Sequence, residues 1–179
     1  MPNYIRWKWE CATYFLTVVT HGRQRFFAAS ENQNLLGECF REARKTYPFE
    51  LDACVLLPDH FHALLTPAEG ADYSTIIRLI KTRFTQHFLT SRPVETGEFE
   101  GTRPGEKRVW QRRFFEHTIR DEIDWERHVN YIHLNPVRHG LVANPEDWSA
   151  SSIHRFMRQE SLKPGWEMLA PPDLVAAWE

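Results

Sequence analysis

The most informative part of the sequence is residues 49–66, which read FELDACVLLPDHFHALLT. Its two halves, Phe49–Leu57 and His60–Thr66, are rich in aliphatic, β-branched and aromatic residues, as β-strands are. The Pro58-Asp59 step between them is a turn signal. These residues therefore predict two consecutive strands joined by a tight turn, which is a β-hairpin.

The second of these strands carries two histidines one residue apart, His60 and His62, with Phe61 between them. Side chains alternate between the faces of a strand, so both imidazoles face one side of the sheet and Phe61 faces the other. Imidazole is a common metal ligand near neutral pH, and the pair predicts a cation site. The alternative interpretation is two histidines that only pack on the sheet.

Strands and helices alternate on both sides of this hairpin. Before it, Thr13–Thr20 (TYFLTVVT) predicts a strand, and Ser30–Gln33 (SENQ) matches a capping box that opens a helix ending near Thr46. After it, apolar residues at helical spacing predict a helix over Tyr73–Leu89.

The rest of the predicted fold follows this second helix. Ser91–Lys107 contains Pro, Gly and alternating charges and is expected to be an exposed loop. Trp110–Ile119 predicts a fourth strand, and Asp121 is a suitable N-cap for a third helix. That helix should end or kink near Asn135, because a residue before proline disfavours helical geometry.

The resulting element order is β-α-β-β-α-β followed by one more helix. This is the order of the split β-α-β, ferredoxin-like folds, an α+β class with an antiparallel sheet and helices on one face. The extra helix would carry Tyr131. Residues 1–159 are expected to form one domain, and residues 160–179 an acidic C-terminal tail.

Tyr131 and Asn135 lie four residues apart and share one stripe of the third predicted helix with Asp124 and His128. An amide oxygen from Asn135 would join the two imidazoles as a ligand, and a cation held there would polarise a phosphoryl oxygen. Tyr131 would then attack phosphorus and hold the cut strand covalently. The alternatives are a half-buried aromatic residue and a polar helix end.

Charge is distributed unevenly along the 179 residues, although the net charge is only −2. Residues 76–120 contain ten Lys and Arg against five Asp and Glu, whereas residues 141–179 contain three against six. The three cysteines are far apart and no apolar run is long enough to span a bilayer. These features predict a cytoplasmic protein with a basic working surface.

Cations and aromatic residues alternate in two segments that suit single-stranded nucleic acid, since cations neutralise phosphates and rings stack on bases. An ordinary solvated surface is the alternative for each. The predicted DNA-binding residues are Arg6, Trp7 and Lys8, the outer helix residues Arg78 and Lys81, and Lys107, Arg108, Trp110, Arg112 and Arg113. The histidines outside the His60/His62 pair are expected to be structural or exposed. His128 is a possible exception, because it shares the helix stripe of Tyr131.

Three segments resemble a known family. His60-Phe61-His62 matches the HUH motif (His, hydrophobic, His) of single-tyrosine HUH transposases, and its context Leu57–His62 resembles that of the REP-associated tyrosine transposases. Trp110–Arg120 and Val129–Gly140 (VNYIHLNPVRHG) are similar to segments of the same family. One departure is Glu10–Thr13, where the family usually carries Gly-Gly-Thr near bound DNA.

The resemblance implies that His60, His62 and Asn135 bind Mg²⁺ or Mn²⁺ and that Tyr131 forms a 5′-phosphotyrosine link. It implies a nuclease and strand transferase acting on single-stranded DNA hairpins of the REP and BIME type, in DNA transposition chemistry. A hairpin-binding protein without cleavage activity is the alternative. We expect a monomer, with a dimer as the alternative, and no membrane partner.

The tail at 160–179 is not explained by these motifs. It contains four acidic residues, one Lys and two Trp, and its prolines disfavour a regular helix. It would either compete with DNA for the basic surface, or pack on the sheet or remain disordered.

Overall fold

The computed structural model describes residues 12–91, 99–101, 107–162 and 166. Within these ranges the strands and helices are, in chain order, β1 (Tyr14–Val19), α1 (Ser30–Thr46), β2 (Phe49–Leu56), β3 (His60–Pro67), α2 (Tyr73–Thr90), β4 (Phe115–Thr118), α3 (Glu122–Arg138) and α4 (Ile153–Arg158). Short 3-10 turns occupy His21–Arg23, Phe26–Ala28 and Pro145–Asp147. None of the described helices is long and apolar enough to cross a membrane.

The sheet has four strands in the order β2-β3-β1-β4, and each neighbouring pair is antiparallel. β1 and β2 therefore run parallel, with β3 inserted between them, which is the split β-α-β arrangement. β2 and β3 form the predicted hairpin around Pro58-Asp59. The predicted α+β, ferredoxin-like fold is confirmed.

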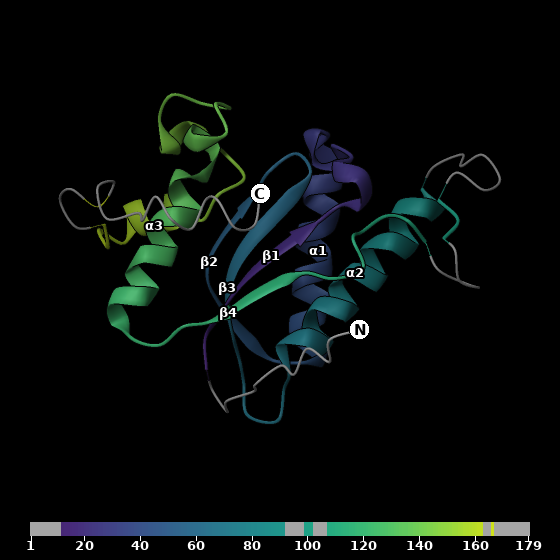
Figure 1. Ribbon diagram of the computed structural model, residues 1–179, viewed down its shortest axis with the longest axis horizontal. Coiled ribbons are helices and arrows are strands. Elements are labelled where there is room, and N and C mark those ends of the chain that lie inside the picture. The colour runs from purple at the N-terminus through teal and green to yellow at the C-terminus, as the bar shows by residue number, and fades with distance from the viewer. Residues whose placement is uncertain (1–11, 92–98, 102–106, 163–165, 167–179) are drawn as a thin grey trace, which may run out of the picture.

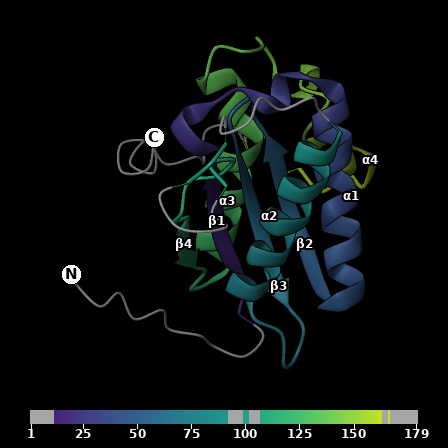
Figure 2. The ribbon, with the colours of Figure 1, turned by 90° about the vertical axis from the view of Figure 1, so that its right-hand side faces the viewer.

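Helices cover both faces of this sheet (Figure 1). α1 and α2 lie side by side on one face, over a core that contains Leu16, Phe61 and Ile80 (Figure 2). α3 packs on the opposite face, against a second core that contains Phe15 and Leu64. The expectation of helices on one face thus holds for α1 and α2, while α3, the helix that carries Tyr131, covers the other face.

Two predictions for residues 91–119 need correction. β4 spans only Phe115–Thr118, since it extends only as far as it pairs with β1, and Trp110 instead forms an isolated bridge with Thr20. Of the predicted exposed loop, residues 92–98 and 102–106 lie outside the described residues. Phe99 within it is buried against Phe26 and Phe88 and is therefore not exposed.

The helix ends differ in how well the sequence predicted them. The prediction of a capping box at Ser30 is wrong. Ala29 is the N-cap, and the hydroxyl of Ser30 donates to the carboxylate of Glu31 instead. Asp121 caps α3 as predicted, since its carboxylate accepts a hydrogen bond from the backbone N–H of Asp124 at 2.8 Å.

α3 continues through Pro136 to Arg138 and does not end at Asn135. Pro136 stands in the last turn, so only one backbone hydrogen bond within the helix is given up there. Beyond it, Gly140 adopts φ +64° and the N–H of Leu141 donates to the carbonyl of Pro136 at 2.9 Å. This closure is a Schellman motif, in which glycine takes the left-handed position that other residues avoid.

Candidate active site

The two histidines of β3 lie on the face of the sheet that α3 covers. Their side chains are almost completely buried, with 2 % of His60 and 1 % of His62 exposed. Phe61 between them belongs to the core under α1 and α2. The prediction that the two imidazoles share one face, with Phe61 on the other, is confirmed.

Tyr131 and Asn135 of α3 lie on the same buried side as these histidines. The ring centroid of Tyr131 is 5.2 Å from that of His62, and the His62 and His60 centroids are 4.9 Å apart. The ring of His139, the C-cap residue directly after α3, lies 5.3 Å from that of His60. The rings thus follow one another in the order Tyr131, His62, His60, His139, with Asn135 between Tyr131 and His139 along the helix.

Hydrogen bonds hold both β3 imidazoles by the same ring nitrogen. Nδ1 of His60 lies 2.6 Å from Oδ1 of Asp59, and Nδ1 of His62 lies 2.8 Å from the hydroxyl of Thr17, its cross-strand neighbour. Arg23 in turn donates to the other carboxylate oxygen of Asp59 at 3.1 Å. An imidazole held at Nδ1 presents its Nε2 lone pair, which is the usual orientation of a metal-binding histidine.

The remaining polar atoms of these side chains are buried without a hydrogen-bond partner. They are Nε2 of His60, Nε2 of His62, and both side-chain polar atoms of Asn135, whose side chain is fully buried. A buried polar atom left unsatisfied is destabilising, and such atoms rarely occur without a functional reason. Two imidazoles and one amide are side chains that could hold a cation.

The pKa shifts at the site favour a neutral imidazole at His62 and an ionised carboxylate at Asp59. Burial holds the pKa of His62 well below its usual value, and the nearby His60, His139 and Arg23 lower it further. The ring is therefore neutral at neutral pH. Burial opposes ionisation of Asp59, but its hydrogen bond with His60 and the nearby Arg23 hold its pKa below the ordinary value.

Tyr131 itself is only 1 % exposed. Its ring meets Phe15 edge to face at 5.7 Å, and the guanidinium of Arg138 lies 5.4 Å from its ring centroid. A phosphate reaches this phenol only after neighbouring side chains have moved. Arg138 is the exposed member of this group.

Four of the predicted DNA-binding residues meet around one open groove of about 510 Å³ beside α2. Its lining includes Arg78, Lys81, Lys107 and Trp110. Trp110 contributes only an edge, because its ring is 7 % exposed and packs on Phe27, Phe61 and Phe84. It therefore cannot stack face to face on a base, contrary to the reason for which the sequence suggested it.

Of the other predicted DNA-binding residues, Arg108, Arg112 and Arg113 do not line this groove. Arg108, Arg112 and Arg113 are exposed on the neighbouring segment. Arg6, Trp7 and Lys8 lie outside the described residues.

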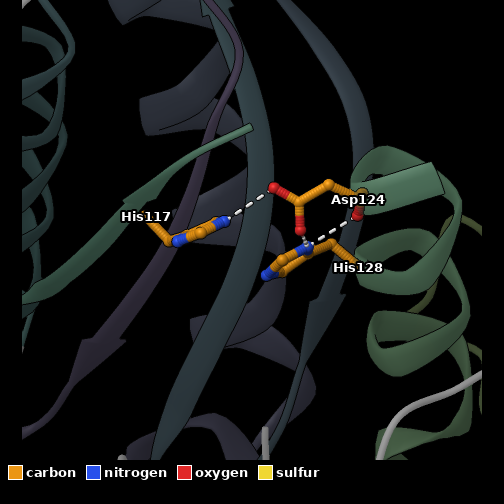
Figure 3. Close-up of side chains that lie close together, drawn as sticks. All are labelled: His117, Asp124 and His128. Carbon is orange, nitrogen blue, oxygen red and sulfur yellow. Dashed lines mark hydrogen bonds and ion pairs between the residues drawn. The ribbon is translucent and has the colours of Figure 1, made fainter. Parts of the chain in front are cut away.

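Sequence reasoning missed a second cluster of polar side chains. His117 of β4 and Asp124 and His128 of α3 lie together on the same face of the sheet (Figure 3). The sequence placed Asp124 and His128 on one stripe of the helix. Their contact with His117 depends on the pairing of β4 with β1 and on where α3 crosses the sheet, which local spacing does not show. His139 beside His60 was likewise expected to be only structural or exposed.

Most of the predicted tail lies outside the described residues. Leu162 and Trp166 are described, and both line a small pocket with Trp125 and Val129 of α3. The start of the tail thus packs against α3.

The sheet carries His60 and His62 on β3 and is faced by a helix with Tyr131, which is the arrangement expected from the resemblance to single-tyrosine transposases. The chain belongs to the family described as "Transposase IS200 like", which it matches over residues 8–135.

Within this family the chain is similar to REP-associated tyrosine transposases. It is 35% identical to the Escherichia coli protein of that name over 156 residues, which are 87% of this chain and 84% of the relative. It is 37% identical over 169 residues, 93% of each chain, to a Haemophilus influenzae protein that bears this name provisionally. A solved structure of a REP-associated tyrosine transposase bound to a REP hairpin superposes with a TM-score of 0.75 at 34% identity, covering 91% of this chain and 89% of the other.

Proposed function

We propose that this protein is a metal-dependent single-stranded DNA endonuclease and strand transferase that acts on REP-type hairpins through a 5′-phosphotyrosine intermediate. The observation that carries the proposal is that His60, His62 and Asn135 have buried polar atoms without a hydrogen-bond partner, while the ring of His62 lies beside that of Tyr131. The REP hairpin bound to the similar transposase supports the choice of substrate.

His60 and His62, through Nε2, and Asn135, through its amide oxygen, would hold Mg²⁺ or Mn²⁺. A cation bound there polarises the scissile phosphate and neutralises its charge. Imidazole ligands suit Mn²⁺ better than Mg²⁺, so Mn²⁺ is the ion of first choice for an assay.

Tyr131 supplies the nucleophile. Its phenolic oxygen forms a bond to phosphorus while the bond from phosphorus to the 3′ oxygen of the preceding nucleotide breaks. The phenol loses its proton, and the 3′ oxygen gains one. The new 5′-phosphotyrosine bond retains the energy of the broken one, so a 3′ hydroxyl of another strand reverses the step and joins the two strands.

The groove beside α2 would bind the hairpin backbone. Arg78, Lys81 and Lys107 supply cations, and the phosphates of a DNA strand release counterions when they bind there. Tyr131 and all three proposed ligands come from one chain, which supports a working monomer. A REP-type DNA hairpin as the substrate is consistent with a location in the cytoplasm of a bacterial cell.

The proposal is tested by incubating the protein with end-labelled REP hairpin DNA and Mn²⁺, then separating covalent adducts on a denaturing gel. We expect an adduct with the parent protein and with Tyr47→Phe, a change at a partly exposed tyrosine far from the site. Tyr131→Phe removes one oxygen and should abolish the adduct while hairpin affinity changes less than about twofold.

Two results would overturn this function. An adduct formed by Tyr131→Phe would assign the nucleophile to another residue. Hairpin binding by the parent protein without any adduct, across Mg²⁺ and Mn²⁺, would leave a hairpin-binding protein without cleavage activity.

A further inference from the structure

A second cation site is suggested by His117, Asp124 and His128, which form a compact cluster on the face of the sheet covered by α3 (Figure 3). One possible ligand atom from each residue lies within 4.8 Å of the other two. Phe15 separates this cluster from the candidate active site, because its ring contacts both His128 at 4.7 Å and His62 at 5.5 Å. We propose that the cluster binds one transition-metal ion, such as Zn²⁺.

His128 has the orientation of a metal ligand. Its Nδ1 donates to the backbone carbonyl of Asp124 at 2.7 Å, which places the ring proton on Nδ1 and the lone pair on Nε2. Nε2 is buried without a hydrogen-bond partner, in a side chain that is 2 % exposed. In Figure 3 it is the nitrogen of His128 without a dashed line, on the side of His117. Metal-binding histidines usually donate their other ring N–H in this way.

Asp124 and His117 complete a donor set of two imidazoles and one carboxylate. Oδ2 of Asp124 lies 2.8 Å from Nε2 of His117, and its Oδ1 lies 3.2 Å from Nδ1 of His128. Ligand atoms around one tetrahedral zinc ion are separated by about 3.3 Å, and the possible ligand atoms of the cluster lie within 4.8 Å of one another, so the three side chains would draw closer together when an ion binds. Nε2 of His117 can carry a proton or bind the ion but not both, so binding would replace its hydrogen bond to the carboxylate.

Charge and access agree with this assignment. Burial opposes ionisation of Asp124, yet the hydrogen bonds from His117 and the backbone of Arg120 hold its pKa below the ordinary value. Burial also lowers the pKa of His128 and keeps its ring neutral. The side chains of His117 and Asp124 are 22 % and 19 % exposed, which leaves room for a water molecule as a further ligand.

The proposed ligands favour zinc-like ions over Mg²⁺ or Ca²⁺, which prefer oxygen-only sites. Because the ligands come from two elements, the ion would tie the short edge strand β4 to the first two turns of α3. The proposed ion therefore stabilises the helix that carries Tyr131 and takes no part in DNA cleavage. The inference stands independently of whether Tyr131 is the nucleophile.

The test is to count cobalt ions by visible absorption and by calorimetry, with Co²⁺ as the probe, in five forms of the full chain. We expect two equivalents in the parent protein and one in His117→Gln. The double variant His60→Gln/His62→Gln should retain one equivalent, and adding His117→Gln to it should leave none. His87→Gln, at an exposed position of α2, is the matched control and should bind as the parent does.

A second measurement protects the test against a variant that fails to fold. Saturating Zn²⁺ should raise the thermal midpoint of the parent protein by several degrees more than that of His117→Gln. If His117→Gln binds as much cobalt as the parent, or the folded double variant binds none, the cluster is a hydrogen-bonded network only and the proposal is wrong. If the double variant unfolds, the comparison of the parent with His117→Gln still decides.

Discussion

Each imidazole of the candidate active site depends on one neighbouring side chain for its orientation. For His62 this neighbour is Thr17, the residue directly opposite it on β1, at 2.8 Å. Thr17→Val keeps the shape of the side chain and removes the hydroxyl, so the ring of His62 is no longer held by its Nδ1. Loss of such a partner typically lowers metal affinity about 10- to 100-fold.

The measurement for this prediction is the Mn²⁺ dependence of adduct formation, together with Mn²⁺ affinity by calorimetry. Thr66→Val is the matched control, because Thr66 lies on the same strand as His62 and its hydroxyl bonds Asp52, away from the site. Equal Mn²⁺ affinity in the parent and Thr17→Val would show that the hydroxyl does not orient His62.

What the sequence predicts at single residues follows from local geometry. The two-residue period of a strand is enough to place His60 and His62 on one face and Phe61 on the other. Helical spacing is enough to relate Tyr131 to Asn135. The partners Thr17 and His117 are different, because they depend on which residue of β1 pairs with which residue of β3 and β4, and no local spacing contains that register.

The C-terminal end of α3 depends on Gly140, four residues after Pro136. Gly140 adopts φ +64°, where any side chain is strained. Gly140→Ala should therefore lower the free energy of unfolding by about 1 kcal/mol, a typical penalty for a left-handed residue. Gly37→Ala is the matched control, because Gly37 lies inside α1 and a methyl group there meets only Arg41 at ordinary contact distance.

The two changes should have opposite signs in urea unfolding. Alanine is preferred over glycine in a helix interior by up to about 1 kcal/mol, so Gly37→Ala should be neutral or stabilising. A Gly140→Ala variant as stable as the parent would contradict the Schellman closure. The sequence predicted an end or a kink near Asn135, whereas the helix continues to Arg138, because the effect of proline is small where the helix is already ending.

α2 and the segment that follows Lys107 together form the proposed DNA groove. Arg78 is exposed on its lining, so Arg78→Gln should weaken hairpin binding and reduce the slope of log affinity against log salt by roughly 0.7–0.9. Fluorescence anisotropy over a salt series measures both. Arg41→Gln on α1, outside this groove, is the matched control, and an equal effect of the two changes would exclude a specific role for the groove.

Acid should destabilise the whole molecule, because the fold holds several imidazoles in their neutral form. Burial lowers the pKa of His133 to about 3, and the pKa values of His62 and His128 are also lowered. In the unfolded chain these rings take up protons below about pH 6.5, while the folded protein does not. Stability is therefore greatest above that pH and falls as the pH drops from 7 toward 4.

Each such ring contributes roughly 1 kcal/mol per pH unit in this interval. Urea midpoints at pH 7, 6 and 5, measured with a chelator present, should fall steadily. His133→Gln should reduce the slope of stability against pH by the contribution of about one ring. His87→Gln should not change this slope. A midpoint that stays constant from pH 7 to pH 5 would show that these rings are already charged in the fold.

The pairing of β1 with both β3 and β4 also sets an order of events during protein synthesis. Tyr14 has one partner, Leu65, as soon as β3 has left the ribosome, but its other partner, Thr118, is translated much later. Domains generally begin to fold from their N-terminal parts at the pace of translation. The histidines of β3 are thus translated before Tyr131, and under the proposed function a nascent or prematurely terminated chain that lacks Tyr131 would be unable to cut DNA. Such a chain also exposes the apolar face that α3 later covers, which marks it for chaperones and proteases.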